Sequence, residues 1–96
     1  MTEPLLPTDF ESLPDRSIVV RLGADEVALE ITSIQALPPT HVRAQPFALM
    51  LRHPGATAYA PQGTYVFRHP LHGELYLFMT PRGPDGHGMS YEVIFN

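Results

Sequence analysis

Apolar and polar residues alternate along this chain in six short runs. Alternation with a period of two is typical of a strand that places one face on a core. It predicts strands at residues 17–22, 27–37, 43–53, 64–68, 74–80 and 90–96. Eleven prolines, about twice the usual share, stand mostly between these runs, where proline ends strands and sets turns. The glycine-rich stretch 81–88 is predicted to be a turn.

The second run changes phase part of the way along. Val27, Leu29 and Ile31 share one face, whereas Ile34 has the opposite parity. A β-bulge inserts one extra residue in a strand and returns later side chains to the original face. The sequence therefore predicts a bulge near residues 32–33.

The fourth and fifth runs form the clearest hairpin. Facing Tyr65 with Leu77 keeps the apolar side chains of both runs on one side. The same register places Arg68 opposite Glu74, so we expect an ion pair across the two strands.

The N-terminal extension, residues 1–16, differs from the rest of the chain. The string Thr-Asp-Phe-Glu at residues 8–11 has the spacing of a capping box and predicts a short helix at residues 9–13. Phe10 and Leu13 lie three residues apart and share a face of that helix. We expect them to plug one end of the sheet.

Length and strand spacing together predict the fold class. Ninety-six residues are enough for one domain and too few for two, so residues 1–96 are predicted to be a single small β domain. Six short strands joined by local turns, with no βαβ pattern, predict an all-β fold. We expect a small antiparallel barrel or sandwich with a short N-terminal helix; the pattern leaves both arrangements open.

Composition removes several classes of function. The chain has no cysteine and no lysine, which excludes disulfides, thiolate nucleophiles and lysine-based phosphate loops. Its net charge of −4 argues against binding nucleic acid through phosphates. We expect no membrane span, since no apolar run approaches the necessary length. The start of the chain does not resemble a signal peptide, which predicts a cytoplasmic location and leaves other routes of export open.

Five histidines are the first candidates for chemistry. His69, His72 and His87 fall in predicted loops near one another in sequence and are weak candidates for a metal site. Zinc needs three or four ligands that converge in space. Solvated loop histidines are the better interpretation, so no cofactor is predicted. With no nucleophile-elbow motif either, we expect a protein that is not an enzyme.

The outward faces of the C-terminal strands carry more apolar residues than a sheet with one wet face should have. The predicted interface residues are Val66, Tyr76, Phe78, Ile94 and Met50. Two explanations stay open. Either the N-terminal extension covers this face, or the face is an exposed surface that binds a partner.

Several strings carry a family resemblance that covers nearly the whole chain. They are Phe-Glu-Ser-Leu at 10–13, Pro-Phe-Ala-Leu at 46–49, Pro-Gln-Gly-Thr-Tyr at 61–65, His-Gly-Glu-Leu at 72–75, Pro-Asp-Gly at 84–86 and Tyr-Glu-Val-Ile-Phe-Asn at 91–96. The chain resembles an uncharacterised bacterial family of small β domains, often encoded near phage-tail-collar-like proteins. The resemblance implies an accessory or assembly role and brings no catalytic residues.

Two hypotheses follow for the function. The first is a structural or protein-interaction module that self-associates or binds a protein partner through its C-terminal strands. The alternative is a small-molecule or metal site at the barrel mouth, built from the loop histidines.

Overall fold

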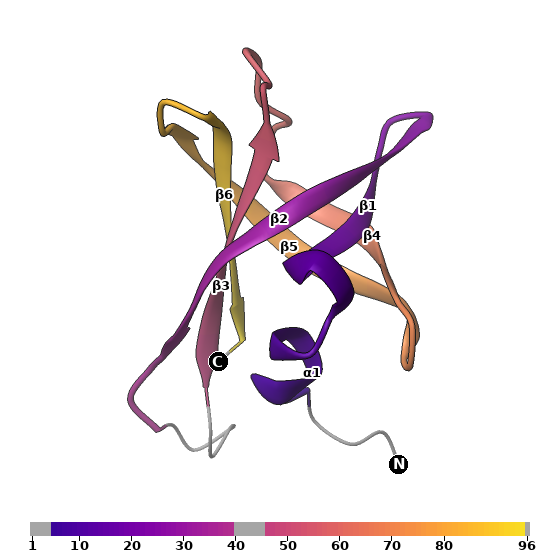
Figure 1. The fold of residues 1–96 in the computed structure, drawn as a ribbon, viewed down its shortest axis with the longest axis vertical. Coiled ribbons are helices and arrows are strands. Elements are labelled where there is room, and N and C mark those ends of the chain that lie inside the picture. The colour runs from indigo at the N-terminus through magenta and orange to yellow at the C-terminus, as the bar shows by residue number, and fades with distance from the viewer. Residues whose placement is uncertain (1–4, 40–45, 96) are drawn as a thin grey trace.

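Six strands close an antiparallel barrel in the computed structural model, which describes residues 5–39 and 46–95 (Figure 1). Their order around the barrel is β1-β2-β3-β6-β5-β4. The strands are β1 (Ser17–Leu22), β2 (Asp25–Ala36), β3 (Phe47–Pro54), β4 (Gly63–His69), β5 (Gly73–Pro84) and β6 (Gly88–Phe95). A helix, α1 (Thr8–Glu11), and a 3-10 turn, η1 (Pro14–Arg16), precede them. The all-β prediction is confirmed, and the arrangement is a barrel.

Most details predicted for the strands are confirmed. The bulge of β2 lies where the change of phase indicates, because Ile31 pairs with Leu51 and the next pair is Ser33 with Met50. Residues 43–45 and 96, which the predicted third and sixth strands included, lie outside the described residues.

The β4–β5 hairpin has the predicted register. Tyr65 pairs with Leu77, and Arg68 pairs with Glu74. The expected ion pair is present, with Arg68 Nη1 lying 3.1 Å from Glu74 Oε2.

Strand β5 is longer than the sequence predicted. It runs on to Pro84 and has a bulge of its own between Pro81 and Gly83, so the predicted turn 81–88 shrinks to residues 85–87. Proline ended the predicted strand because it lacks a backbone N–H. A bulge is one of the few places in a sheet where that missing donor is tolerated.

The predicted capping box is absent. Helix α1 begins one residue early, after Pro7, and ends at Glu11, and no side chain caps its first turn. Instead, the carboxylate of Asp9 accepts a hydrogen bond from Leu6 N at 2.7 Å, ahead of the helix. The helix is too short for its own hydrogen bonds to hold it, so its packing matters more.

The barrel consists of two three-stranded meanders with matching construction. Strands β1, β2 and β3 form the first meander, and β4, β5 and β6 form the second. In each meander the middle strand has 12 residues and a bulge toward the third strand. Leu51 and Tyr91 stand opposite the two bulges and also pair with each other. The topology is thus consistent with a pseudo-two-fold axis near this pair.

Two seams join the meanders, and they differ in length. Strands β3 and β6 pair over eight residues, whereas the β1–β4 register contains two pairs. At the long seam the backbones of β3 and β6 approach closely, since a Cβ on Gly88 would lie 2.2 Å from the His53 carbonyl oxygen. That position therefore requires glycine.

An arginine bridges the meanders at each seam. Arg52 Nε lies 2.7 Å from Asp85 Oδ2 of the second meander, and its Nη1 lies 3.8 Å from Glu30 of the first. Arg68 contacts Glu26 of the first meander and Glu74 of the second. The Arg-His-Pro string that the chain contains twice thus places both arginines at seams.

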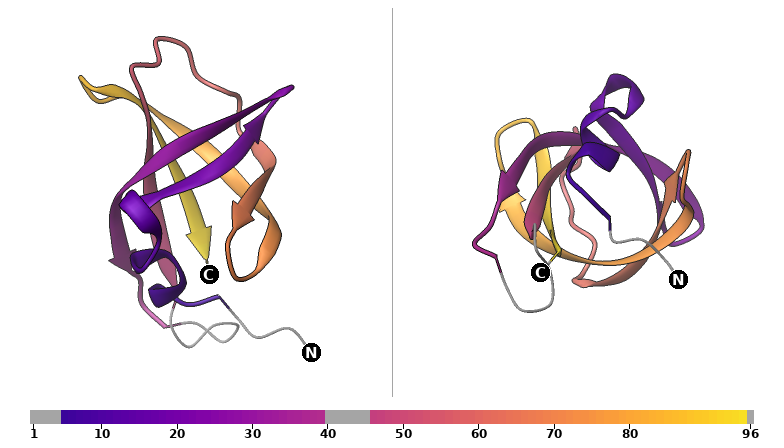
Figure 2. Two further views of the ribbon diagram at one scale, coloured as in Figure 1. Left: turned by 45° about the vertical axis from the view of Figure 1, so that its right-hand side comes forward. Right: turned by 90° about the horizontal axis from the view of Figure 1, so that it is seen from below.

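The N-terminal plug, residues 5–16, closes one end of the barrel (Figure 2, right). Phe10 inserts among Phe47, Phe95 and His69, with ring centroids 5.4–6.0 Å from its own. Leu13 is buried beside it. The predicted plug is confirmed.

The crossing loop, residues 55–62, passes over the opposite end on its way from β3 to β4 (Figure 2, left). Two tyrosine hydroxyls from the barrel anchor it: Tyr91 accepts a hydrogen bond from Ala60 N at 2.8 Å, and Tyr65 donates one to the Pro61 carbonyl. Each end of the barrel is therefore closed by the segment that precedes one meander.

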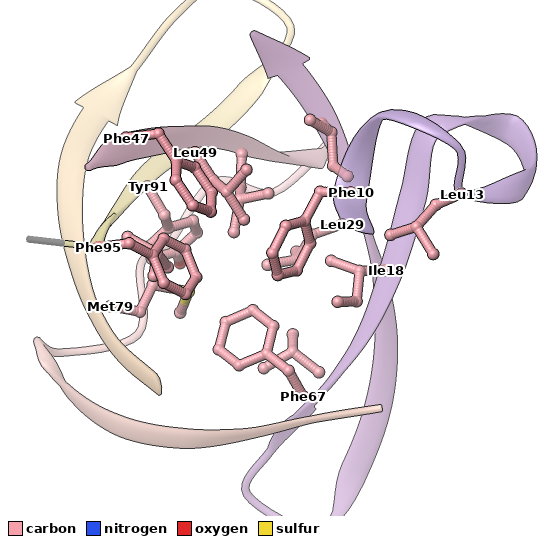
Figure 3. Close-up of a cluster of buried hydrophobic side chains, with 14 of the residues drawn as sticks. Phe10, Leu13, Ile18, Leu29, Phe47, Leu49, Phe67, Met79, Tyr91 and Phe95 are labelled. Atoms are coloured by element: carbon pink, nitrogen blue, oxygen red, sulfur yellow. The ribbon is translucent and has the colours of Figure 1, made fainter. Parts of the chain in front are cut away.

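Apolar side chains fill the barrel between these two closures (Figure 3). The largest fully buried side chains come from all six strands and α1: Tyr91, Phe10, Phe47, Phe67, Leu29, Leu49, Leu51, Met79, Val20 and Val93. The interior is thus packed core, as expected for a barrel of few strands.

Candidate functional site

The outer patch comprises the five predicted interface residues Met50, Val66, Tyr76, Phe78 and Ile94. Tyr76 is 68% exposed, Phe78 55% and Ile94 50%, whereas Met50 and Val66 are half-buried. Large apolar side chains of this kind are normally turned inward. The patch is therefore a surface that the barrel leaves in contact with solvent.

The strand register explains how the outer patch is arranged. Val66 pairs directly with Tyr76 on β5. The last β5–β6 pair is Thr80 with Glu92, and Phe78 and Ile94 are the next outward residues on their strands, beyond the paired part. The three exposed side chains thus lie on neighbouring strands.

A charged pair borders the outer patch. Glu92 pairs across the sheet with Met50, and its carboxylate lies 3.6 Å from Arg82 Nη1. An apolar centre with a polar border is typical of protein-binding surfaces.

Residues 5–16, the described part of the N-terminal extension, do not cover the outer patch. They lie at the end of the barrel, where Phe10 and Leu13 are 1% and 6% exposed, respectively. The explanation in which this segment shields Tyr76 and Phe78 is therefore wrong. A helix of four residues can fill the end of the barrel or cover an outer face, but not both. The end of the barrel buries the Phe10 ring more completely than an outer face would.

His69 has a structural role that sequence reasoning missed. It is 4% exposed, so the prediction of a solvated loop histidine is wrong for this residue. Its Nε2 lies 2.6 Å from the Asp9 carbonyl oxygen and must donate to it. Its Nδ1 accepts hydrogen bonds from the backbone N–H groups of Leu71 and His72. The ring therefore carries its proton on Nε2 and ties the plug to the β4–β5 turn.

His72 adds a second tie between the same two segments. Its Nε2 lies 3.0 Å from Asp9 Oδ1. Partial burial raises the pKa of the Asp9 carboxyl, but the hydrogen bonds from His72 and Leu6 N and the nearby histidines outweigh it. The pKa of Asp9 is therefore lower than its usual 3.8.

The third candidate histidine lies far from the other two. His87 is in the turn between β5 and β6, at the end of the barrel opposite α1 (Figure 1). In the part of the chain that the structure describes, no three His, Cys, Asp or Glu side chains form a group that could hold a metal ion. The three histidines do not make one site.

A shallow hollow of about 470 Å³ lies beside His87. Its wall includes Thr57 of the crossing loop, Pro84, Met89 and glycine backbone. His87 is the one titratable side chain on this wall, and general acid–base chemistry usually needs a second group to orient or assist the first. The hollow could therefore hold a small molecule, but its wall has few groups that could catalyse a reaction.

The tyrosine anchors of the crossing loop were also missed from the sequence. The ring of Tyr91 is part of the core, and the ring of Tyr65 packs against it. A buried tyrosine hydroxyl nearly always needs a hydrogen-bond partner, and this was the available signal. Desolvation and the neighbouring Tyr91 raise the pKa of the Tyr65 hydroxyl.

Comparisons with known proteins add a family. No curated protein and no solved structure matches the chain significantly. Within the described residues, no helix has both the length and the apolar character that crossing a membrane demands. One family model matches residues 5–95, nearly the whole chain. The chain therefore belongs to the family described as Domain of unknown function (DUF6916).

Proposed function

We propose that this barrel is a non-enzymatic structural or protein-interaction module that docks through the outer patch. An accessory or assembly component of a phage-tail-like system is the role we propose for it. The single observation that carries the proposal is the exposure of Tyr76, Phe78 and Ile94 on neighbouring strands.

The first meander supports this proposal by contrast. The outward residues of its long strand are polar or small, namely Glu26, Ala28, Glu30 and Thr32. A barrel of this topology can therefore carry a solvated outer face on its middle strand. The apolar character of β5 is not required by the fold, which favours a role in binding.

Energetics indicate how strong such docking can be. Full burial of a Tyr, Phe or Ile side chain is worth roughly 1.5–3 kcal/mol. Because these three are already partly buried, covering them yields about 3–5 kcal/mol in total. Association itself opposes binding by an estimated ~4–15 kcal/mol. The outer patch would therefore serve as the centre of a larger contact or of a repeated one, as an assembly component provides.

Site-specific photo-crosslinking in the native host tests this proposal. A photoreactive phenylalanine analogue replaces Phe78 in one variant and Ala28 in a matched control. Ala28 is exposed on the outer face of β2, the counterpart of β5. We expect discrete protein adducts from position 78 and none from position 28. The same adducts from both positions, or none from either, would remove the proposal.

A further inference from the structure

Among the described residues, strand β5 has an open backbone edge along more than half of its length. Residues 73–79 pair with β4 on one side, through seven consecutive pairs. On the other side, the pairing with β6 begins only at Thr80. Residues 73–79 thus have no strand partner on that side in the register of the described residues. The plug meets this hairpin at His69 and His72, which precede the open edge.

The matching strand of the first meander also has such an edge, but it is protected. Residues 25–29 of β2 pair with β1, and the pairing with β3 begins at Glu30. That edge carries the exposed carboxylates of Asp25 and Glu26. Charged side chains are one way in which proteins prevent open edges from pairing with other chains.

The open edge of β5 has less of this protection. Residues 75–79 read Leu-Tyr-Leu-Phe-Met, without a charge or a proline. Glu74 is the one charged residue among its seven positions, whereas the β2 edge has two carboxylates among five. An uncharged edge with strong β propensity is a template for another strand.

We propose that a second copy of this chain pairs with this edge, so that two β5 strands run antiparallel about a two-fold axis at Tyr76. This inference rests on the proposed docking role and names the partner. A two-fold contact requires a surface that is complementary to itself. Residues 75–77 read the same in both directions, and centring the pair on Tyr76 uses the whole open edge from residue 73 to residue 79.

This register places compatible side chains opposite one another on both faces of the paired strands. On the outer face, Tyr76 lies opposite its own copy, and each Glu74 lies opposite Phe78, so that like charges do not meet. Because Val66 pairs with Tyr76 within one copy, an apolar row of four residues crosses the contact. On the inner face, Leu75 lies opposite Leu77, and both of these half-buried side chains gain cover.

The net charge gives the contact a characteristic dependence on salt. Each copy carries −4, so the two repel each other at low ionic strength. Salt screens this repulsion beyond roughly 10 Å at 0.1 M and leaves the apolar contact and the backbone hydrogen bonds in place. Dimer formation should therefore strengthen as salt is added, whereas a contact made of ion pairs would weaken.

Cysteine substitution tests the register directly, because the natural chain has no cysteine. Residues directly opposite in an antiparallel pair have Cα atoms about 4.5–5.5 Å apart, within reach of a disulfide. We expect the single variant Tyr76→Cys to cross-link into dimers on mild oxidation. In Phe78→Cys the two cysteines would lie roughly 14 Å apart along the strands, and Ala28→Cys lies on the other meander. Neither should cross-link above background.

Light scattering from micromolar to millimolar concentrations provides the second measurement. We expect the wild type to form dimers, more so at higher salt, and Tyr76→Lys to weaken dimer formation at least tenfold, with Ala28→Lys as the matched control. A wild type that stays monomeric throughout would overturn the self-pairing, while adducts from position 78 to a different protein would still support the proposed function. Cross-linking at position 78 as efficient as at position 76 would also overturn it, because it indicates face-to-face contact.

Discussion

The two meanders share one plan for the inside of the barrel and differ on the outside. Both have a 12-residue middle strand, a bulge toward the third strand and a preceding segment that closes one end. Outside, β2 carries Glu26 and Glu30, whereas the corresponding face of β5 carries Tyr76 and Phe78. Closing the barrel constrains only the inward positions. The outward positions are therefore free to differ, and the difference is what motivates the proposed docking surface.

The two end closures differ as much as the two outer faces. The plug seals its end with an aromatic side chain, Phe10, which packs at a tilt against the rings of Phe47 and Phe95. The crossing loop seals the other end with the small side chains of Ala56 and Ala60 and with hydrogen bonds to tyrosine hydroxyls. The first closure depends on buried apolar area and the second on polar anchors.

The largest expected loss of stability comes from removing the Phe10 ring from the plug. Phe10→Ala removes a ring that is 1% exposed, and such truncations cost about 3–5 kcal/mol. Domains of this size are stable by only about 5–15 kcal/mol. Urea unfolding followed by far-ultraviolet circular dichroism measures the loss. Leu71→Ala is the control, since Leu71 is 81% exposed in the neighbouring turn. A loss from Phe10→Ala no larger than from this control would mean that the plug contributes nothing to the barrel.

The inward plan was predictable from the sequence. Alternation with period two, the bulge of β2 and the β4–β5 register all follow from local patterns, because a strand with one buried face fixes the parity of its residues. The β1–β4 and β3–β6 seams were not predictable. They join segments distant in sequence, and no local pattern encodes which edges meet.

The outward position of the candidate site residues was predictable for the same reason. The parity of Tyr76, Phe78 and Ile94 indicated an outward position, and their exposure confirms it. What covers them depends on where the N-terminal segment packs, a question of tertiary structure. The role of His69 was not predicted because it also depends on tertiary packing. The residue that buries its ring is Phe10, which is distant in sequence.

The plug should also lose stability in acid. The folded-state pKa of Asp9 is lower than 3.8, so its carboxylate stabilises the fold. That contribution is complete above the unfolded pKa and disappears as the pH falls from about 4 through the lower folded value. Asp9→Asn should therefore lower stability at neutral pH and flatten its decline below pH 4. Unfolding midpoints measured across this pH range provide the test.

A matched carboxylate at the other end sharpens this prediction. The hydrogen bond from Arg52 lowers the pKa of Asp85, with help from His87 N. Asp85→Asn should change the pH profile in the same direction, and Asp25→Asn, at the exposed first residue of β2, controls for the loss of one negative charge. If Asp25→Asn flattened the acid decline as much as Asp9→Asn, the effect would belong to net charge and not to the plug.

The smallest losses of stability should come from replacing the two bridging arginines. Which replacement costs more compares the two seams. The side chain of Arg52 is 24% exposed and that of Arg68 is 40% exposed. Exposed ion pairs contribute about 0.2–1 kcal/mol, and less where solvent screens them more. Arg52→Met should therefore cost close to 1 kcal/mol and Arg68→Met less, with both losses shrinking as salt is added. Urea unfolding at low and high salt distinguishes them. The reverse order would mean that the short β1–β4 seam, which has fewer backbone pairs, depends more on its charged bridge than the long one does.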